Sequence, residues 1–184
     1  DQFSETFQQC RLLDKLLTDK IGRKISIGAF YGTTPYTSTE ESVQQVKWAP
    51  YYAEGYICPV LRCPACSGDL IWTKSDIRAR EERLKCVACK RLVTSDEIIL
   101  TRQRLQNSVP DFLFSTTEML NRQLSSSQSG HLFGVGSVQK PHIVLLDEVH
   151  TYHGTHGAQV ANLLRRWRKA LGTKVQFTGL SATV

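Results

Sequence analysis

The stretch PHIVLLDEVHTYHGTH, residues 141–156, decides the fold that we expect for this chain. Its apolar residues, Ile143 to Leu146, form a short strand pattern that stops at two adjacent carboxylates, Asp147 and Glu148, with His150 close behind. Ligands of open α/β sheets bind at the carboxyl ends of the strands, so acids at this point are candidates for chemistry. The alternative interpretation is a plain strand end whose acids only cap the next helix.

The residues that follow predict a helix and one more strand. A helix is expected over residues 157–171, because apolar residues recur there at three- and four-residue steps. Its apolar face comprises Val160, Leu163, Leu164, Trp167 and Leu171. Gly172 should end this helix, and a strand is expected over 174–178. Strands that alternate with helices predict an α/β fold with a parallel sheet.

The same reasoning applies upstream. Before the cysteine-rich region, the pattern predicts a helix over Asp1 to Asp19, a strand over Lys24 to Tyr31 and a loop over Tyr36 to Pro50. After that region, it predicts a strand over Asp111 to Ser115, a helix over Thr116 to Leu124 and a loop over Ser125 to Lys140. Thr116 or Thr117 is the expected cap of the second helix.

Four of the six cysteines form two C-x-x-C pairs, Cys63 with Cys66 and Cys86 with Cys89. Four thiolates at this spacing suit tetrahedral zinc, so we expect a structural zinc ribbon; with four thiolates bound, the metal has no open position for catalysis. A redox dithiol pair or disulfides are the alternatives, and nothing marks the chain as secreted. Cys10 and Cys58 lie off the pattern.

Basic residues surround the second cysteine pair. Two of them, Lys90 and Arg91, come directly after it, and five precede it: Lys74, Arg78, Arg80, Arg83 and Lys85. Trp72 is a candidate platform on which nucleic-acid bases could stack. Asp76, Glu81 and Glu82 dilute the positive charge. The pattern therefore fits a nucleic-acid face and a mixed, solvated surface equally well.

Composition bounds these interpretations. The 184 residues are 41% apolar and 22% charged, which is typical of a globular protein with a substantial core. We find neither a signal peptide nor an apolar run of membrane-spanning length, so we expect an intracellular, cytoplasmic protein without a membrane partner. A net charge of +6 makes a polyanionic partner plausible without establishing one.

Three motifs together resemble those of superfamily 2 helicases of the DEAD/DEAH type. Asp147-Glu148-Val149-His150 resembles motif II, Ser181-Ala182-Thr183 resembles motif III, and Thr116 to Asn121 (TTEMLN) resembles motif Ib. Residues 154–166 and the turn 31–35 are similar to segments of repair helicases of the MrfA and Hrq groups and of DISARM-type phage-defence helicases. The resemblance covers residues 1–36 and 111–184, and the cysteine-rich region lies outside it.

The resemblance implies a RecA-like (P-loop NTPase-type) domain that binds ATP and Mg²⁺. Asp147 would hold Mg²⁺, Glu148 would orient and deprotonate the attacking water, and His150 would link the nucleotide site to Ser181, Ala182 and Thr183. Residues on the preceding helix would bind the nucleic-acid backbone, namely Thr116, Thr117, Glu118 and Asn121. The similarity to repair helicases makes DNA the expected partner, while the residues themselves do not distinguish DNA from RNA.

The expected organisation is a RecA-like domain (1–50 and 109–184) interrupted by a zinc ribbon at 51–108. No G-x-x-x-x-G-K-[ST] loop occurs, so we expect a fragment of a larger helicase that does not hydrolyse ATP by itself. The main alternative is a non-catalytic zinc-ribbon module on a RecA-like remnant, which would bind nucleic acid or a protein partner. A hydrolase that uses His150, His153 and His156 would need a second metal.

Overall fold

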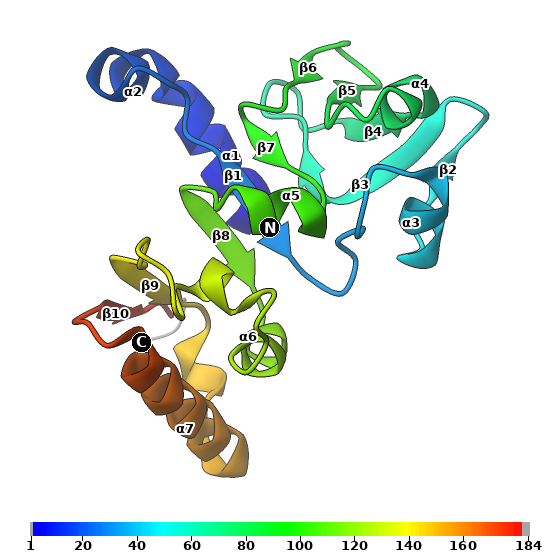
Figure 1. Cartoon of the computed structure of the whole chain (residues 1–184). Helices are drawn as coiled ribbons and strands as arrows, with labels where there is room; N and C mark the ends of the chain where they lie inside the picture. Colours follow the sequence, from blue (N-terminus) through cyan, green and yellow to red (C-terminus); the bar gives the residue numbers. More distant parts are fainter. Residues whose placement is uncertain (1, 182–184) are drawn as a thin grey trace. The chain divides into compact units, whose positions relative to one another are not determined.

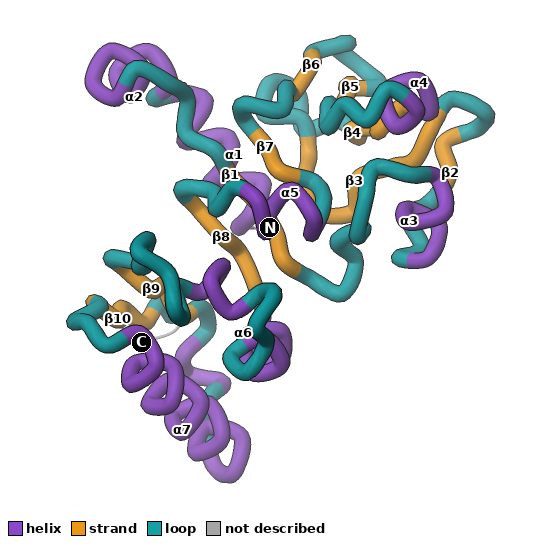
Figure 2. The backbone as a smooth tube through the Cα atoms, in the orientation of Figure 1, coloured by secondary structure: helices purple, strands orange, loops and turns teal. Residues whose placement is uncertain are grey.

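The computed structural model describes residues 2–181 of the chain (Figure 1). The chain divides into two compact units, Asp1–Ser115 and Thr116–Val184. Helices and strands occur in both units, and each unit contains a parallel sheet (Figure 2). The mixed α/β class and the parallel strand pairing predicted from the sequence are therefore confirmed, whereas the RecA-like arrangement stays a prediction.

A three-stranded parallel sheet forms the centre of the first unit, in the order β7-β1-β8. Its strands are β1 (Ile27–Phe30), β7 (Ile98–Ile99) and β8 (Phe112–Ser115). All four residues of β1 are buried, as expected for the central strand of a parallel sheet. Residues of β7 therefore pair with residues of β1 that lie 71 positions earlier, and the strands between them belong to a separate antiparallel sheet.

The helix predicted over residues 1–19 is divided into two helices. α1 (Gln2–Leu12) buries Phe3 and Phe7, while α2 (Asp14–Ile21) has no buried residue. Gly22 ends α2 in the left-handed conformation, with φ of 72°. The prediction of one continuous helix was wrong because the apolar spacing continues past the break at Leu13, where the backbone leaves the helical region.

An ion pair between Arg23 and Asp111 connects the segment before β1 to the start of β8. Both guanidinium Nη atoms of Arg23 donate to the Asp111 carboxylate at 2.6 Å, and the Ser26 amide donates to it at 2.9 Å. The Arg23 guanidinium lowers the pKa of Asp111 to about 2, against the opposing effect of burial. Asp111 therefore stays ionised at neutral pH and keeps the two strand starts together.

The second sheet of this unit is antiparallel and five-stranded, in the order β2-β3-β4-β5-β6. Its strands are β2 (Pro50–Tyr51), β3 (Gly55–Arg62), β4 (Asp69–Thr73), β5 (Leu84–Cys86) and β6 (Leu92–Val93). Two short helices accompany it, α3 (Glu40–Gln45) and α4 (Lys74–Arg78). The loop predicted over residues 36–50 thus contains a helix, whose N-cap is Thr39.

Buried side chains of this sheet and of the parallel sheet belong to one hydrophobic cluster. It contains Phe7 from α1, Ile27 from β1, and Leu70 and Trp72 from β4. Gly55 allows the strands to approach closely, because a Cβ there would lie 2.2 Å from the Trp72 carbonyl oxygen. The cysteine-rich region therefore shares its core with the parallel sheet.

The second unit contains the parallel pair β9 (Ile143–Leu146) and β10 (Gln176–Gly179). Its helices are α6 (Thr117–Gln123), η1 (Gly130–Phe133), η2 (Val149–Thr151) and α7 (Gly154–Leu171). Trp167 of α7 lies 6.3 Å from the Phe133 ring and 6.1 Å from the Phe177 ring, and its indole N–H donates to the Phe133 carbonyl. This indole therefore ties α7 to both β10 and η1.

Most boundaries in the second unit agree with the sequence pattern. Thr116 caps α6, and Gly172 ends α7 with φ of 66°. The predicted loop over residues 125–140 contains η1, a single 3₁₀ turn. Among the described residues, no helix is long and apolar enough to cross a bilayer.

Candidate functional site

The four cysteines of the two C-x-x-C pairs lie together. The sulfur atoms of Cys63, Cys66, Cys86 and Cys89 are all within 4.8 Å of one another. The Cys63–Cys89 and Cys66–Cys86 sulfur pairs are each 3.5 Å apart. Sulfur atoms around tetrahedral zinc are separated by about 3.8 Å, since the zinc–sulfur bond is about 2.3 Å. The cluster is compatible with a structural zinc site.

Both cysteine pairs lie in turns of the same conformation. The Cys63 amide donates to the Gly68 carbonyl at 2.9 Å, and the Cys86 amide donates to the Arg91 carbonyl at 2.8 Å. The residue after the second cysteine of each pair is left-handed, with φ of 57° at Ser67 and 65° at Lys90. Two turns of one geometry, brought together by β4 and β5, therefore present the thiols to a common point.

The thiols of the cluster differ in acidity. Burial raises the pKa of Cys63 to about 12, and the neighbouring thiols of Cys89 and Cys86 act in the same direction. Burial also acts to raise the pKa of Cys86, but hydrogen bonds from the Cys89 amide and the nearby thiols lower it to about 6. A bound Zn²⁺ would hold all four as thiolates and stabilise the fold of the turns. Cys58, outside the cluster, is buried, and its pKa is raised to about 11.

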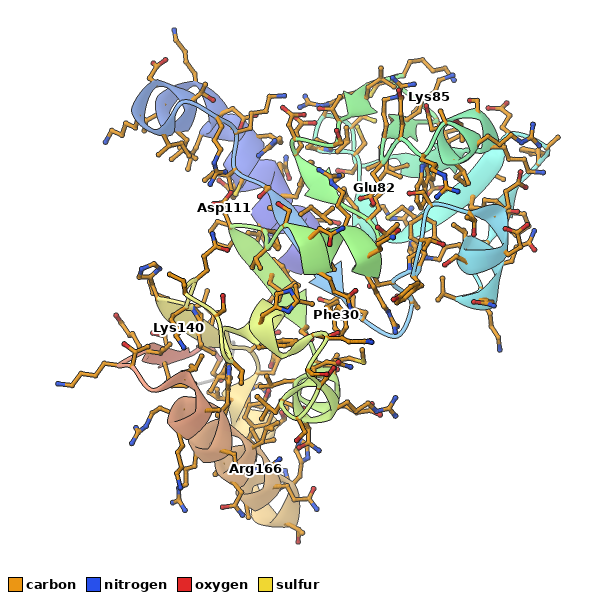
Figure 3. All side chains as sticks on the ribbon, in the orientation of Figure 1. Phe30, Glu82, Lys85, Asp111, Lys140 and Arg166 are labelled. Atoms are coloured by element: carbon orange, nitrogen blue, oxygen red, sulfur yellow. The ribbon has the colours of Figure 1, made fainter. Side chains whose placement is uncertain are left out.

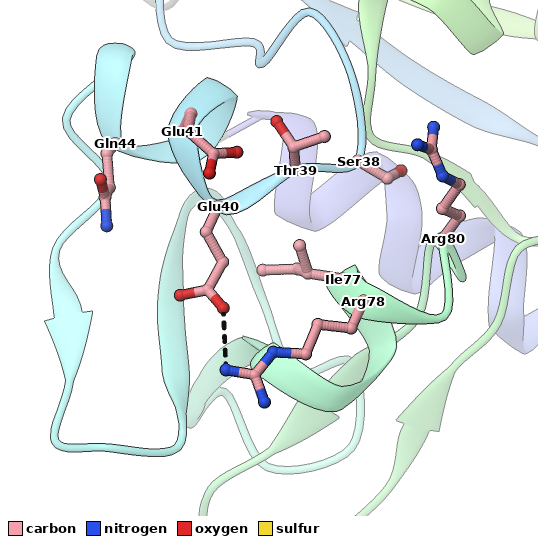
Figure 4. A pocket seen from close by; sticks show the side chains of 8 residues that line it. All are labelled: Ser38, Thr39, Glu40, Glu41, Gln44, Ile77, Arg78 and Arg80. Carbon is pink, nitrogen blue, oxygen red and sulfur yellow. Dashed lines mark hydrogen bonds and ion pairs between the residues drawn. The ribbon is translucent and has the colours of Figure 1, made fainter.

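The surface of the antiparallel sheet is electrically mixed. Lys74 and Arg78 both pair with Glu40, and Arg83 pairs with Asp76 at 2.5 Å. The open groove between α3 and α4, of about 510 Å³, contains the Glu40–Arg78 pair at 3.2 Å (Figure 4). These bases therefore have their charges partly neutralised by acids of the same unit.

The proposed stacking role of Trp72 was wrong. This side chain is fully buried, with its indole N–H donated to the Glu81 carbonyl at 2.8 Å. The ring also packs 6.0 Å from the Trp48 ring. A tryptophan in alternation on a strand is compatible with either face of a sheet, and here it is on the core face.

The carboxylate box follows β9, as predicted. His150 bridges two groups: its Nδ1 lies 2.9 Å from the Ser181 hydroxyl, and its Nε2 lies 3.2 Å from the Glu148 carboxylate. Glu148 adopts the left-handed conformation with φ of 48°, which is uncommon for a residue other than glycine. Asp147 is exposed and has no partner among residues 2–181.

Backbone contacts bring the ends of β9 and β10 together. The Leu180 amide donates to the Leu146 carbonyl at 2.8 Å, and the Val149 amide donates to the Leu180 carbonyl at 3.0 Å. A Cβ at Gly179 would lie 3.0 Å from Val149 Cγ1, so the glycine allows the Val149 side chain to pack closely against β10. Ser181 thereby reaches His150, whereas Ala182 and Thr183 lie outside the described residues.

The residues predicted to bind nucleic acid lie on or beside α6. The Thr116 hydroxyl accepts a hydrogen bond from the Met119 amide at 3.1 Å and so serves as the N-cap. Glu118 pairs with Arg122 at 2.6 Å, and the Asn121 side-chain oxygen accepts from Arg166 of α7 at 3.2 Å. Thr117 is the first residue of the helix. Their role in binding nucleic acid stays a prediction.

The alternative of a histidine metal site has no matching cluster in the part of the chain that the structure describes. There, the four cysteines are the only group of metal-binding side chains close enough to share an ion. His156 packs its ring 5.7 Å from that of Tyr152.

Gly157 fixes the start of α7 close to the box. A Cβ at this position would lie 2.5 Å from the Tyr152 carbonyl oxygen, a backbone atom that has little room to move. Helix propensity alone predicts that Gly157→Ala stabilises α7 by up to about 1 kcal/mol. We expect destabilisation by about 1–3 kcal/mol instead, because alanine overlaps the backbone of residue 152.

Thermal unfolding of the Gly157→Ala variant shows whether the substitution stabilises or destabilises the protein. Ala161→Gly, at an exposed position of the same helix, is the control and should cost about 1 kcal/mol through propensity. A higher midpoint for Gly157→Ala than for the unaltered chain would contradict the contact.

The sequence reasoning missed the roles of two charged residues. Arg102 was not singled out, and Glu82 (labelled in Figure 3) was counted only as an acid that dilutes the positive charge, although it is 5% exposed and makes three hydrogen bonds. No signal in the sequence separates Glu82 from its exposed neighbour Glu81.

Comparison with known proteins gives partial similarities to two much longer chains. An uncharacterized ATP-dependent helicase of Methanocaldococcus jannaschii is 26% identical over 96 residues, which cover 50% of this chain and 14% of the helicase. The Druantia protein DruE of Escherichia coli is 33% identical over 85 residues, which cover 42% of this chain and 5% of DruE. No model of a known family matches the chain, and no solved structure matches it significantly. These similarities support a helicase-related protein.

Proposed function

We propose that the chain is part of the motor of an ATP-dependent nucleic-acid helicase or translocase, with DNA as its substrate. In this proposal Asp147 holds Mg²⁺ through water, and Glu148 orients and deprotonates the water that attacks ATP. Zinc has a structural role only, at the four cysteines. The partial similarity to an ATP-dependent helicase supports this assignment.

The observation that carries the proposal is the bridge made by His150. Its two ring nitrogens lie beside Glu148 and Ser181, which follow two neighbouring parallel strands. A change at the carboxylate end can therefore reach the segment after β10 through one side chain. We propose that this bridge couples ATP hydrolysis to movement along the nucleic acid, with Ala182 and Thr183 continuing the coupling segment.

Nucleic acid is proposed to bind through the phosphate backbone. The second unit contains seven Lys and Arg residues and three Asp and Glu residues, giving a net charge of +4. Thr116, Thr117, Glu118 and Asn121 would lie beside the strand, with the hydroxyl groups and the helix start directed at phosphate. Contacts of this kind supply affinity without reading sequence.

Two measurements test the proposed function. The 184-residue chain should bind single-stranded DNA in a salt-dependent way and should not hydrolyse ATP, because it lacks a phosphate-binding loop. In the full-length product of the gene, Glu148→Gln should lower DNA-stimulated ATP hydrolysis about 100-fold or more, as expected for loss of a general base. The exposed Glu41→Gln is the control and should retain activity.

ATP hydrolysis that survives Glu148→Gln would reject the assigned role of this carboxylate. DNA binding without nucleotide hydrolysis in the full-length protein would favour the non-catalytic zinc-ribbon module instead.

A further inference from the structure

The turn that follows β1 has every backbone carbonyl occupied. Residues 31–36 contribute six successive carbonyl oxygens, and each accepts at least one hydrogen bond from within the first unit. Such complete pairing is unusual for an exposed turn, whose carbonyls ordinarily bind water. The side of this turn that bears the carbonyls is therefore held by protein.

Most of these hydrogen bonds come from the start of α5 (Arg102–Asn107). The Arg102 guanidinium donates to the carbonyls of Thr34 and Tyr31, each at 3.0 Å, and to that of Gly32 at 3.4 Å. The first two amides of α5, those of Arg102 and Gln103, donate to the carbonyls of Pro35 and Tyr36 at 2.8 and 3.0 Å. One arginine and one helix start thus satisfy five of the six carbonyls, and these amides are ones that a helix cannot pair internally.

The remaining carbonyl, that of Thr33, accepts a hydrogen bond from a residue that packs against the antiparallel sheet. The indole N–H of Trp48 donates to this carbonyl at 2.8 Å, and the Trp48 ring packs against Trp72 of β4. Arg102 also lies over the Phe30 ring, with its guanidinium carbon 5.4 Å from the ring centre. Apart from the Thr34 amide of the turn itself, all the donors therefore lie within or next to the cysteine-rich region.

Glu82 fixes the helix start that carries Arg102. Its carboxylate accepts from the Leu100 amide at 2.6 Å, from the Thr101 hydroxyl at 2.5 Å and from Arg104 at 3.2 Å. The Thr101 hydroxyl in turn accepts from the Arg104 amide and caps α5. A buried carboxylate with three donors therefore orders the residues on both sides of Arg102.

Glu82 is itself placed by the metal-binding sheet. It lies two residues before β5, the strand that ends in the metal ligand Cys86. The preceding carbonyl, that of Glu81, accepts the indole N–H of the buried Trp72. An ordered cysteine cluster thus holds β5 in place, β5 positions Glu82, and Glu82 positions the helix start from which Arg102 contacts the turn.

The amide side of the turn has the opposite character. The Tyr31 amide donates to the Thr34 hydroxyl, and the Thr34 amide donates to the Tyr31 carbonyl. The amides of Gly32 and Thr33, both exposed residues, have no partner among residues 2–181. With the carbonyls held inward, these two N–H groups are the donors that the turn offers to an anion such as phosphate.

We propose that the cysteine-rich region is a brace for this turn: Glu82 and Arg102 are positioning residues that hold residues 31–36 so that the Gly32 and Thr33 amides face a backbone phosphate. The brace acts without the sheet itself touching the nucleic acid, in keeping with the ion pairs of Lys74, Arg78 and Arg83 and the burial of Trp72. The phosphate contact rests on the proposed function, whereas the brace does not.

Amide hydrogen exchange at the turn tests the brace directly. Glu82→Gln removes one acceptor and the negative charge beside Arg104 although Glu82 contacts no atom of the turn. We expect exchange of the Tyr31 and Thr34 amides to accelerate at least about ten-fold, the equivalent of about 1.4 kcal/mol. Arg102→Lys, which keeps the charge and loses the fork of donors, should do the same. Glu81→Gln is the matched control, being exposed, and should leave exchange unchanged.

Zinc content and DNA affinity show which part of the proposal fails: the brace, the phosphate contact or the proposed function. Both variants should keep one bound zinc per chain and bind single-stranded DNA about five- to ten-fold more weakly, because loss of one or two phosphate contacts is of that size. Unchanged turn exchange in Glu82→Gln and Arg102→Lys would overturn the brace. Faster exchange with unchanged DNA affinity would retain the brace and reject the phosphate contact, and absence of DNA binding by the unaltered chain would reject the proposed function.

Discussion

Replacing Cys63 and Cys66 together by serine should remove bound zinc from the chain and unfold the five-stranded sheet. The unaltered chain should bind one zinc ion at the four cysteines, whose sulfur atoms lie within 4.8 Å of one another. Structural zinc in small domains is bound with about 10–16 kcal/mol, and this free energy is coupled to folding. Loss of two thiolates removes most of it, which is comparable to the total stability of an ordinary domain, about 5–15 kcal/mol.

The measurements are zinc stoichiometry and the dispersion of amide resonances. The Cys63→Ser, Cys66→Ser chain should hold less than about 0.1 zinc per chain, and residues of β3 to β6 should lose their native resonances. Resonances of β9, β10 and α7 should persist, since they belong to the other compact unit. A chelator applied to the unaltered chain should reproduce this pattern.

Cys58→Ala provides the matched control. Cys58 is as buried as Cys63 but lies outside the cluster. This variant should keep full zinc occupancy while losing a little stability from the small cavity that it creates. Retention of zinc by the double serine variant, or its loss from Cys58→Ala, would contradict the ligand assignment.

Trp72→Ala should destabilise the first unit by about 3–5 kcal/mol, the cost of removing a fully buried tryptophan. The ring is fully buried in the shared hydrophobic cluster, and it packs against Trp48 and donates a hydrogen bond to the Glu81 carbonyl. Its removal leaves a cavity where the antiparallel sheet meets the parallel sheet. Denaturant unfolding should show the loss as a lower midpoint for this unit.

Trp72→Phe separates packing from nucleic-acid binding. Phenylalanine keeps much of the apolar volume and loses the indole N–H, so we expect a smaller cost of about 1–2 kcal/mol. The folded Trp72→Phe chain should bind single-stranded DNA within about two-fold of the unaltered chain, because a buried ring cannot stack on a base. A large loss of affinity in the folded variant would restore a binding role for Trp72.

Local patterns predicted the features that depend on residues close together in the sequence. The spacing of the cysteine pairs was enough to predict that the four thiols lie together, because two short turns and a hairpin bring them to one place. The apolar run 143–146 and the acids after it predicted the strand and the box. Caps and stops such as Thr116 and Gly172 followed from the backbone preferences of single residues.

Other features could not be predicted, because they depend on residues far apart in the chain. The pairing of β7 with β1 was hidden, since two-residue strands carry no periodic signal of their own. The break at Leu13 was also missed, because it falls inside a longer apolar pattern. The helix α3 was missed because it lies in a polar segment.

The sequence by itself therefore determined the chemistry that the chain can offer: four thiols at zinc spacing, and a carboxylate pair and a histidine after an apolar strand. Only the tertiary structure decided which side chains are accessible. It buried Trp72, turned Glu82 inward beside the exposed Glu81, and directed Arg102 onto the turn after β1. The physical reason is that burial and long-range hydrogen bonds arise from packing between distant segments, whereas metal spacing and helix capping arise within a few residues.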